Sequence, residues 1–156
     1  MISMEEEYQL LEESIKDHIF ELAWDPQGTH VLQKLVFFDV ITTKIIQNLY
    51  EVCKDSKGLS VVKKIIAYHK EKSKIKYISG CIQQDLIRIC QSNFGQYIIQ
   101  QVLESWEEED YIPIFEEIHA NLSILTLNKQ SSWVLEKWKE KASSELVKKY
   151  LQVEIP

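Results

Sequence analysis

Four groups of three residues recur along this chain of 156 residues, and their side chains could hydrogen-bond to a ligand or stack on one. Within each group the first and third residues are four positions apart, so on a helix they project from one face, with the middle residue beside them. Repeated at every step, the groups predict a ladder of binding side chains along one surface. The groups are Thr29, His30 and Gln33; Leu59, Ser60 and Lys63; Gln96, Tyr97 and Gln100; and Ser132, Trp133 and Glu136.

A small residue stands directly before each group and marks an internal repeat. Apolar residues recur six and nine positions before it, which places them on one face of a first helix, and an apolar pair recurs three and four positions after it, in a second helix. The small residues are Gly28, Gly58, Gly95 and Ser131, separated by 30, 37 and 36 residues. A short polar residue stands three positions before each of them, and we expect it to turn the chain or cap a helix. These polar residues are Asp25, Asp55, Ser92 and Asn128. The apolar pairs are Val31 and Leu32, Val61 and Val62, Ile98 and Ile99, and Val134 and Leu135.

Each unit is therefore expected to be a first helix, a tight turn and a second helix that buries its apolar face only against a neighbour. This predicts an all-α helical repeat solenoid of four repeats, in one domain over 1–156. The period alone fits tetratricopeptide, HEAT or armadillo repeats equally. We expect the repeats at 12–38, 41–69, 78–105 and 111–141, with the segments 1–11 and 142–156 as polar end caps.

Composition and charge narrow the classes of function. The chain is 45% apolar and 27% charged, has four Gly and three Pro, and has no apolar run long enough for a membrane helix. Its N-terminus carries Glu5, Glu6 and Glu7 where a signal peptide would be basic, so we expect a cytosolic or nuclear protein. The net charge is −6, but residues 54–76 hold eight lysines against two acids, so a basic segment lies within an acidic chain.

No pattern typical of catalysis is found. The histidines (His18, His30, His69 and His119) lie in different repeats without metal-binding spacing, and there is no glycine-rich phosphate loop. We interpret Cys53, Cys81 and Cys90 as reduced thiols of the helical core, and the acidic run 107–110 as a solvated loop between repeats. The sequence therefore predicts no enzyme, no metal and no cofactor.

The turns and second helices resemble the Pumilio (PUF) family of RNA-binding repeats. The segments 25–36 (DPQGTHVLQKLV) and 92–104 (SNFGQYIIQQVLE) carry the resemblance best, and 57–66 and 130–137 are weaker copies. It extends from about Ile15 to Lys141. The resemblance implies a right-handed, armadillo-like superhelix whose concave face binds single-stranded RNA, one base per repeat.

The resemblance also implies a role for each group of three. Glu136 with Ser132 suits the donors of a guanine edge, Gln100 with Gln96 suits uracil, and Thr29 with Gln33 suits adenine, while His30, Tyr97 and Trp133 would stack on bases. The second group departs from the pattern because Leu59 forms no hydrogen bond and Lys63 has no acceptor. We expect it to read no particular base and to contact phosphate. Since RNA runs antiparallel to the protein in this family, the expected element is 5′-GUNA-3′.

Two classes of function follow. The first is a cytoplasmic regulator that binds a messenger RNA element, such as one in a 3′ untranslated region, and controls its translation or stability with protein co-regulators on the convex face. A nucleolar relative that binds without sequence preference is a variant of this class, although such relatives are basic and this chain is acidic. The second is a helical-repeat protein scaffold that has lost specific RNA reading, for which the net charge and Leu59 argue. The oligomeric state is left open.

Overall fold

The structure is a computed structural model that describes residues 2–142, and all regular elements in this range are α-helices, as predicted. None of the described helices is both long and apolar enough to cross a membrane. The chain divides into two compact units, Met1–Tyr68 (unit 1) and His69–Pro156 (unit 2). Of the predicted C-terminal cap, 143–156 lies outside the described residues.

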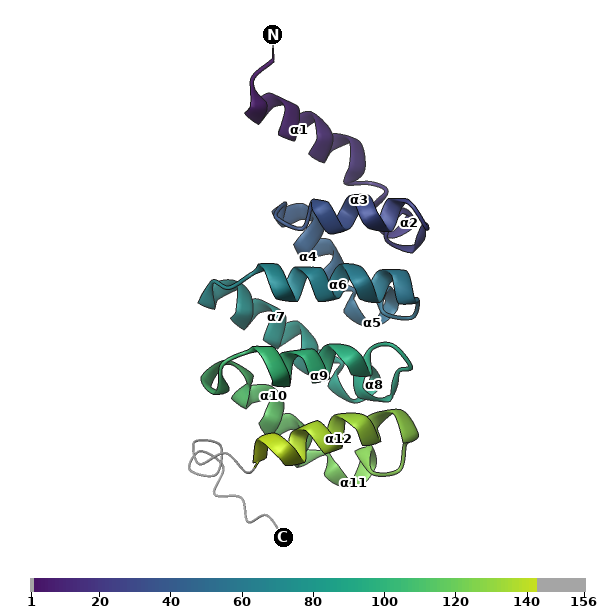
Figure 1. Cartoon of the computed structure of the whole chain (residues 1–156), viewed down its shortest axis with the longest axis vertical. Helices are drawn as coiled ribbons and strands as arrows, with labels where there is room; N and C mark the ends of the chain where they lie inside the picture. The colour runs from purple at the N-terminus through teal and green to yellow at the C-terminus, as the bar shows by residue number, and fades with distance from the viewer. Residues whose placement is uncertain (1, 143–156) are drawn as a thin grey trace. The chain divides into compact units, whose positions relative to one another are not determined.

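Unit 1 holds α1 (Met4–Ile15), α2 (Ile19–Trp24), α3 (Gly28–Lys34), α4 (Asp39–Gln47), α5 (Leu49–Val52) and α6 (Ser56–Tyr68) (Figure 1). Unit 2 holds α7 (Lys72–Gln84), α8 (Leu86–Gln91), α9 (Gln96–Ser105), α10 (Glu108–Ala120), α11 (Leu122–Leu125) and α12 (Lys129–Ala142).

Each repeat contains three helices rather than the two that were predicted, because the first helix is broken in two. The breaks between α4 and α5, α7 and α8, and α10 and α11 fall at Asn48, Asp85 and Asn121, whose φ angles of −122°, −126° and −119° leave the helical range. At two of them the side-chain amide donates to the carbonyl four residues back, Asn48 to Lys44 and Asn121 to Glu117. Short polar side chains compete with the helix in this way.

The turns before the second helices are held by the short polar residues, as predicted. Asp25 accepts hydrogen bonds from the backbone N–H groups of Gln27 and Gly28 at 2.9 and 2.7 Å. The same bonds recur from Lys57 to Asp55, from Gly95 to Ser92, and from Gln130 and Ser131 to Asn128. These donors hold the pKa values of the Asp25 and Asp55 carboxyls below the ordinary 3.8.

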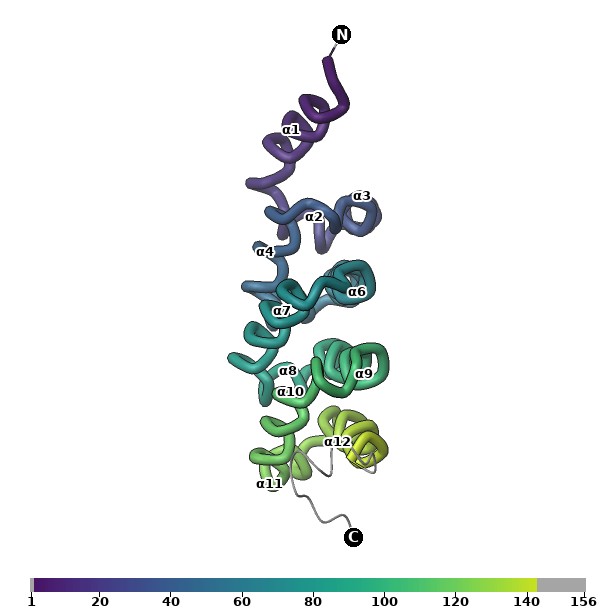
Figure 2. Tube along the Cα trace, turned by 90° about the vertical axis from the view of Figure 1, so that its left-hand side faces the viewer, coloured from purple at the N-terminus to yellow at the C-terminus, as the bar shows by residue number. Residues whose placement is uncertain are grey.

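The helices of each unit form two layers. In unit 1, α3 and α6 lie side by side on one side of α2 and α4, and in unit 2, α9 and α12 lie side by side on one side of α7 and α10 (Figure 2). The predicted apolar pairs of the second and third repeats are fully buried between the layers, as are Leu32 and Val134. Leu135 is partly exposed and Val31 is exposed, which differs from the prediction.

Candidate functional site

In unit 1 the predicted ladder begins with a hydrogen-bonded pair on α3. The Thr29 hydroxyl donates to the carbonyl oxygen of Lys57 in α6 at 3.0 Å and accepts a hydrogen bond from Nε2 of Gln33 at 3.2 Å. Thr29 is buried, whereas Gln33 is partly exposed. A hydrogen bond to the neighbouring repeat therefore holds the Thr29 side chain in place, and Thr29 in turn orients the amide of Gln33.

In unit 2 the same pair of positions on α9 repeats this arrangement. Nε2 of Gln100 donates a short hydrogen bond to Oε1 of Gln96, whose own Nε2 donates to the carbonyl oxygen of Asn93 at 3.4 Å. Gln96 is buried and Gln100 partly exposed. Two repeats of different composition thus hold a glutamine amide in the same way.

The burial of Thr29 and Gln96 differs from the prediction that both residues of a pair project outward. The next second helix along the chain in the same unit, α6 or α12, packs against α3 or α9. Thr29 and Gln96, the first residues of the two pairs, are buried, whereas Gln33 and Gln100 are partly exposed. Neighbouring repeats make this contact, so a single repeat's sequence does not show it.

In the other two groups the third residue, Lys63 or Glu136, is exposed. On α6 the hydroxyl of Ser60 donates to the carbonyl of Ser56 at 3.2 Å, and on α12 the hydroxyl of Ser132 donates to the carbonyl of Lys129. Neither of these hydrogen bonds joins the serine to the third residue of its group, and Lys63 and Glu136 are both exposed. Leu59 is partly exposed and has no polar group to orient a neighbour.

The middle residue of three of the four groups has a flat side chain. His30 on α3 is exposed, and Tyr97 on α9 and Trp133 on α12 are each about half exposed. In unit 2 the turns that carry these helices are joined because Nε2 of Gln130 donates to Oδ1 of Asn93 at 2.8 Å. This inter-repeat bond was not predicted, since Asn93 and Gln130 lie 37 residues apart and only the packing of repeats brings them together.

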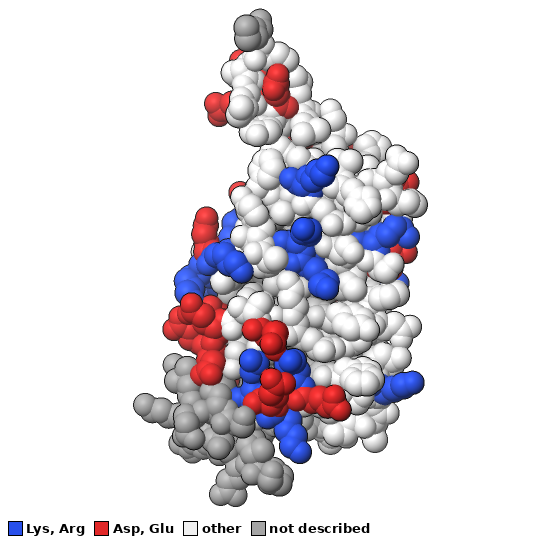
Figure 3. Space-filling view, in the orientation of Figure 1, with Lys and Arg blue, Asp and Glu red and all other residues white. Residues whose placement is uncertain are grey.

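Charge is distributed differently on the two units. On unit 1 the exposed lysines of α3 and α6 are Lys34, Lys63 and Lys64, and blue side chains lie over both helices in Figure 3. On unit 2, red and blue side chains are mixed over α9 and α12 (Figure 3). There Nζ of Lys137 pairs with Glu104 at 2.7 Å and with Glu140 at 3.4 Å.

The acidic run that was predicted as a loop instead begins a helix. Glu107 is the N-cap of α10, and Glu109 and Asp110 lie in its first turn, where negative charge is favourable. Nζ of Lys72 on α7 lies 3.3, 3.1 and 2.7 Å from the carboxylates of Glu107, Glu109 and Asp110, which raise its pKa. A lysine therefore occupies the position of a cation among these acids.

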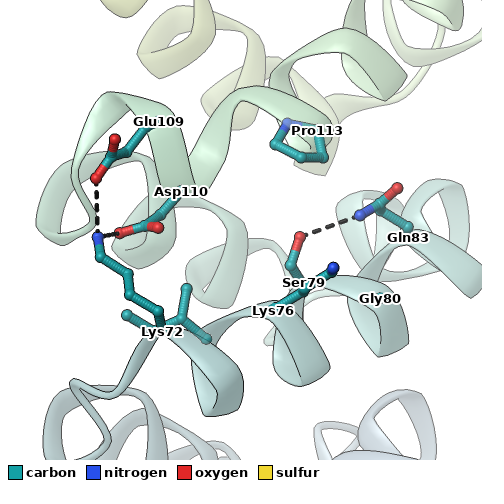
Figure 4. A pocket seen from close by; sticks show the side chains of 9 residues that line it. Lys72, Lys76, Ser79, Gly80, Gln83, Glu109, Asp110 and Pro113 are labelled. Carbon is teal, nitrogen blue, oxygen red and sulfur yellow. Dashed lines mark hydrogen bonds and ion pairs between the residues drawn. The ribbon is translucent and has the colours of Figure 1, made fainter.

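A groove of about 430 Å³ follows this ion cluster between α7 and α10. Its floor is formed by small or apolar residues, Ile75, Ser79, Gly80 and Pro113, with Lys72 at one end (Figure 4). None of the predicted ladder residues lines it.

The cysteines are free thiols. Cys53 and Cys90 are buried, and burial raises the pKa of each to about 12, so both are protonated at neutral pH. Cys81 is only partly buried, and burial also raises its pKa. The prediction of core thiols is confirmed for the first two.

A model of a known protein family matches part of the chain. The family model for the Pumilio-family RNA binding repeat matches residues 18–38 and 86–119. These ranges include the two glutamine pairs, Thr29 with Gln33 and Gln96 with Gln100.

Curated relatives and solved structures agree with that match. The chain is 27% identical over 139 residues to Pumilio homolog 12 of Arabidopsis thaliana, covering 85% of this chain and 23% of that protein. It is 28% identical over 108 residues to Pumilio homolog 9 of the same plant, covering 62% of this chain and 19% of that protein. The chain thus spans about a fifth of the length of these relatives.

Among solved structures, the chain resembles PUF-8 in complex with PBE-RNA, with a TM-score of 0.72 and 27% identity over 88% of this chain and 42% of that one. It also shares the fold of a Puf4 mutant bound to a Cox17 RNA 3′ UTR recognition sequence. That match has a TM-score of 0.79 and 18% identity over 97% of this chain and 52% of that one.

Proposed function

Because this chain is a Pumilio-type repeat protein, we propose that it binds single-stranded RNA through the exposed polar and flat side chains of α3, α6, α9 and α12. The observation that carries the proposal is the pair of glutamine amides, Gln33 and Gln100, each of which donates a hydrogen bond to the side chain four residues earlier in its own repeat. A donor and an acceptor held in place in this way suit the edge of an unpaired base, since less entropy is lost on binding.

Counting hydrogen-bond valences shows what each amide can read. A glutamine side chain has two N–H groups and a carbonyl oxygen. Gln33 uses one N–H on Thr29, and Gln100 uses one on Gln96, so each keeps one donor and one acceptor. One donor and one acceptor match either adenine or uracil, so the amide alone does not choose between them. The resemblance to the Pumilio family supports the assignment of adenine to the Thr29 pair and of uracil to the Gln96 pair.

The fourth repeat suits guanine. The carboxylate of Glu136 only accepts hydrogen bonds, and the Watson–Crick edge of guanine offers two N–H donors. Trp133 and Tyr97 occupy equivalent positions on α12 and α9, which pack together in unit 2. Both rings are available for stacking, worth about 1 to 3 kcal/mol per base.

The second repeat contributes positive charge and does not recognise a particular base. Leu59 offers no hydrogen bond and Ser60 uses its hydroxyl on Ser56. The exposed Lys63 and Lys64, with Lys34 on α3, favour contact with phosphate. The proposed element is therefore 5′-GUNA-3′, read from the fourth repeat to the first.

In the cell, we propose that the protein binds such an element in messenger RNA and alters its translation or stability, together with protein co-regulators in the cytoplasm. Family resemblance alone supports this wider role.

The decisive experiment is fluorescence anisotropy with short labelled RNAs at near-physiological salt. One oligomer contains GUNA, and its matched control has only the G changed. We expect at least about a tenfold preference for the first, or about 1.4 kcal/mol. Equal binding to both would contradict base reading by Glu136, and no binding to any RNA would contradict the proposal.

A protein scaffold is the second candidate, and the groove between α7 and α10 is the observation that favours it. Its small floor residues leave space that a side chain of a partner could fill. Gly80 provides a test because a Cβ added there would meet no atom within 4 Å. Gly80→Met would fill the groove without disturbing the fold, and it should leave RNA binding unchanged.

A further inference from the structure

The glutamine pair of unit 2 belongs to a longer chain of hydrogen bonds. Nε2 of Gln100 donates to Oε1 of Gln96, and Nε2 of Gln96 donates to the backbone carbonyl oxygen of Asn93. A carbonyl has no proton to donate, so turning over either amide would place two oxygen atoms against each other. Asn93 therefore sets the direction of both side chains. As a result, Gln100 presents its carbonyl oxygen and its second N–H in a fixed order.

The fourth repeat holds Asn93 in place. The hydrogen bond from Gln96 to Asn93 is 3.4 Å long, beyond the usual range of about 2.7 to 3.2 Å, so a small shift of Asn93 would break it. Nε2 of Gln130, near the start of α12, donates to Oδ1 of Asn93 at 2.8 Å. The backbone N–H of Gln130 is itself bonded to Asn128 at 2.9 Å. A side chain of the next repeat thus anchors the residue that directs the amides, where α9 and α12 lie side by side (Figures 1 and 2).

Unit 1 provides an internal comparison. The residue directly before the small residue of the next repeat is Lys57 in unit 1 and Gln130 in unit 2. Lys57 holds the preceding pair with its backbone carbonyl, which accepts from Thr29, whereas Gln130 uses its side chain. The ammonium group of Lys57 lies 3.3 Å from the carboxylate of Asp55, in its own turn. The identity of the side chain at this position should therefore matter in unit 2 and not in unit 1.

The direction of the Gln100 amide decides between the two pyrimidines. Uracil offers an N–H donor between two carbonyl oxygens, whereas cytosine offers a nitrogen acceptor beside an amino group. Donor and acceptor are thus interchanged at neighbouring positions of the two bases. With the base held by stacking on Tyr97, an amide that can turn over pairs with either pyrimidine, and an amide held in one direction favours one of them.

We propose that Gln130, acting through Asn93, is a positioning residue that makes the third repeat prefer uracil to cytosine. The inference rests on the proposed function, because it requires Gln100 to contact a base. It adds that recognition of this base depends on a side chain of the neighbouring repeat. The equivalent side chain in unit 1, that of Lys57, has no such role.

The test is fluorescence anisotropy with the GUNA oligomer and a matched oligomer in which only the U is changed to C. Gln130→Met keeps the length of the side chain but removes the donor. The preference for U should then fall about two- to tenfold, the value of one hydrogen bond. Lys57→Met is the matched control, because it leaves the carbonyl that accepts from Thr29. It should leave the preferences for uracil and for adenine unchanged.

Two substitutions of Asn93 separate positioning from a general effect on folding. Asn93→Asp keeps an acceptor for Gln130, so it should keep the preference for U even though its charge weakens binding to both oligomers. Asn93→Leu removes the acceptor and should act like Gln130→Met. The double variant of Asn93→Leu and Gln130→Met should lose no more than either single variant, because both break the same bond. Circular dichroism verifies that each variant is folded.

Nuclear magnetic resonance of the side-chain NH2 groups, without RNA, distinguishes this inference from the proposed function. The signals of Gln96 and Gln100 should shift in Gln130→Met, whereas that of Gln33 should not shift in Lys57→Met. A wild-type preference for U that persists in Gln130→Met would overturn the inference alone. Shifted signals with no wild-type preference between U and C would contradict base contact by Gln100, and both proposals for this repeat would then fail.

Discussion

The hydroxyl of Ser131 donates a hydrogen bond to the carbonyl oxygen of Leu125, six residues earlier. In the second repeat the same place is taken by Gly58, which lies so close to Val52 that an added Cβ would be 2.0 Å from the Val52 carbonyl oxygen. The two residues allow the same close approach of the second helix to the preceding turn in different ways. Glycine lets the second helix approach the carbonyl, and serine uses the carbonyl as an acceptor.

Substitution of Gly58 by alanine should therefore be costly. We expect Gly58→Ala to lower the free energy of unfolding by about 1 to 3 kcal/mol, because the backbone must move to admit the methyl group. Gly80→Ala is the control, since a Cβ there has open space around it within α7. It should raise stability by about 0.5 to 1 kcal/mol. Urea unfolding followed by circular dichroism measures both, and an equal effect of the two substitutions would show that the close approach is unimportant.

The repeat and its turns were predictable because they depend on residues close together in sequence. Asp25 and Gly28 lie three residues apart, and that spacing alone predicts the turn whose hydrogen bond the structure shows. Asn48 as a helix break was missed, because a polar residue within an apolar pattern fits an exposed helix position equally well. The burial of Thr29 was missed for a different reason: it depends on Lys57, in the next repeat.

Guanine reading by Glu136 predicts a loss confined to one base. Glu136→Gln replaces one of the two acceptors with a donor, so binding to the GUNA oligomer should weaken by about 1 to 3 kcal/mol. Binding to the oligomer with the changed G should be unaffected. Fluorescence anisotropy of both RNAs tests this, and an equal loss for both would assign Glu136 a role other than base reading.

The hydroxyl of Thr29 is expected to orient Gln33. Thr29→Val keeps the shape of the side chain but removes both hydrogen bonds, so preference for adenine at that position should fall by about 0.5 to 1.5 kcal/mol. Ser60→Ala is the matched control, because the Ser60 hydroxyl bonds only its own helix and its repeat is expected to read no base. If the two substitutions have equal effects on RNA preference, Thr29 does not position the amide.

Phosphate contact by the lysines of α6 predicts a change in salt dependence. Replacing Lys63 and Lys64 by glutamine should weaken all RNA sequences about equally. It should also reduce the slope of log K against log salt concentration by about 0.7 for each lost phosphate contact. Anisotropy titrations at several salt concentrations give the slope. An unchanged slope would place both lysines outside the RNA contact.

Acid should destabilise the turns of unit 1. The backbone N–H donors hold the pKa values of Asp25 and Asp55 below 3.8, so folding favours the charged carboxylates. Their contribution is fully present above pH about 4, the pKa of an unfolded aspartate, and is lost as the pH falls through the lower folded values. Asp25→Asn with Asp55→Asn keeps an acceptor at each turn, as Asn128 does in the fourth repeat, but does not titrate. Thermal unfolding between pH 6 and pH 2, a range chosen to span these pKa values, should show a smaller decrease for this variant than for the wild type.

The bond from Thr29 to Lys57 has a consequence for how such a protein can evolve. Its acceptor is a backbone carbonyl, so the first repeat depends on where the second repeat lies and not on which side chains it carries. Substitutions in the second repeat that keep its backbone in place leave the Gln33 amide oriented. Leu59 and Lys63 can therefore coexist with an intact Thr29–Gln33 hydrogen bond in the adjacent repeat. Under the proposed function, loss of base recognition in the second repeat does not spread to the first, and the specificity of unit 1 for RNA can change one repeat at a time.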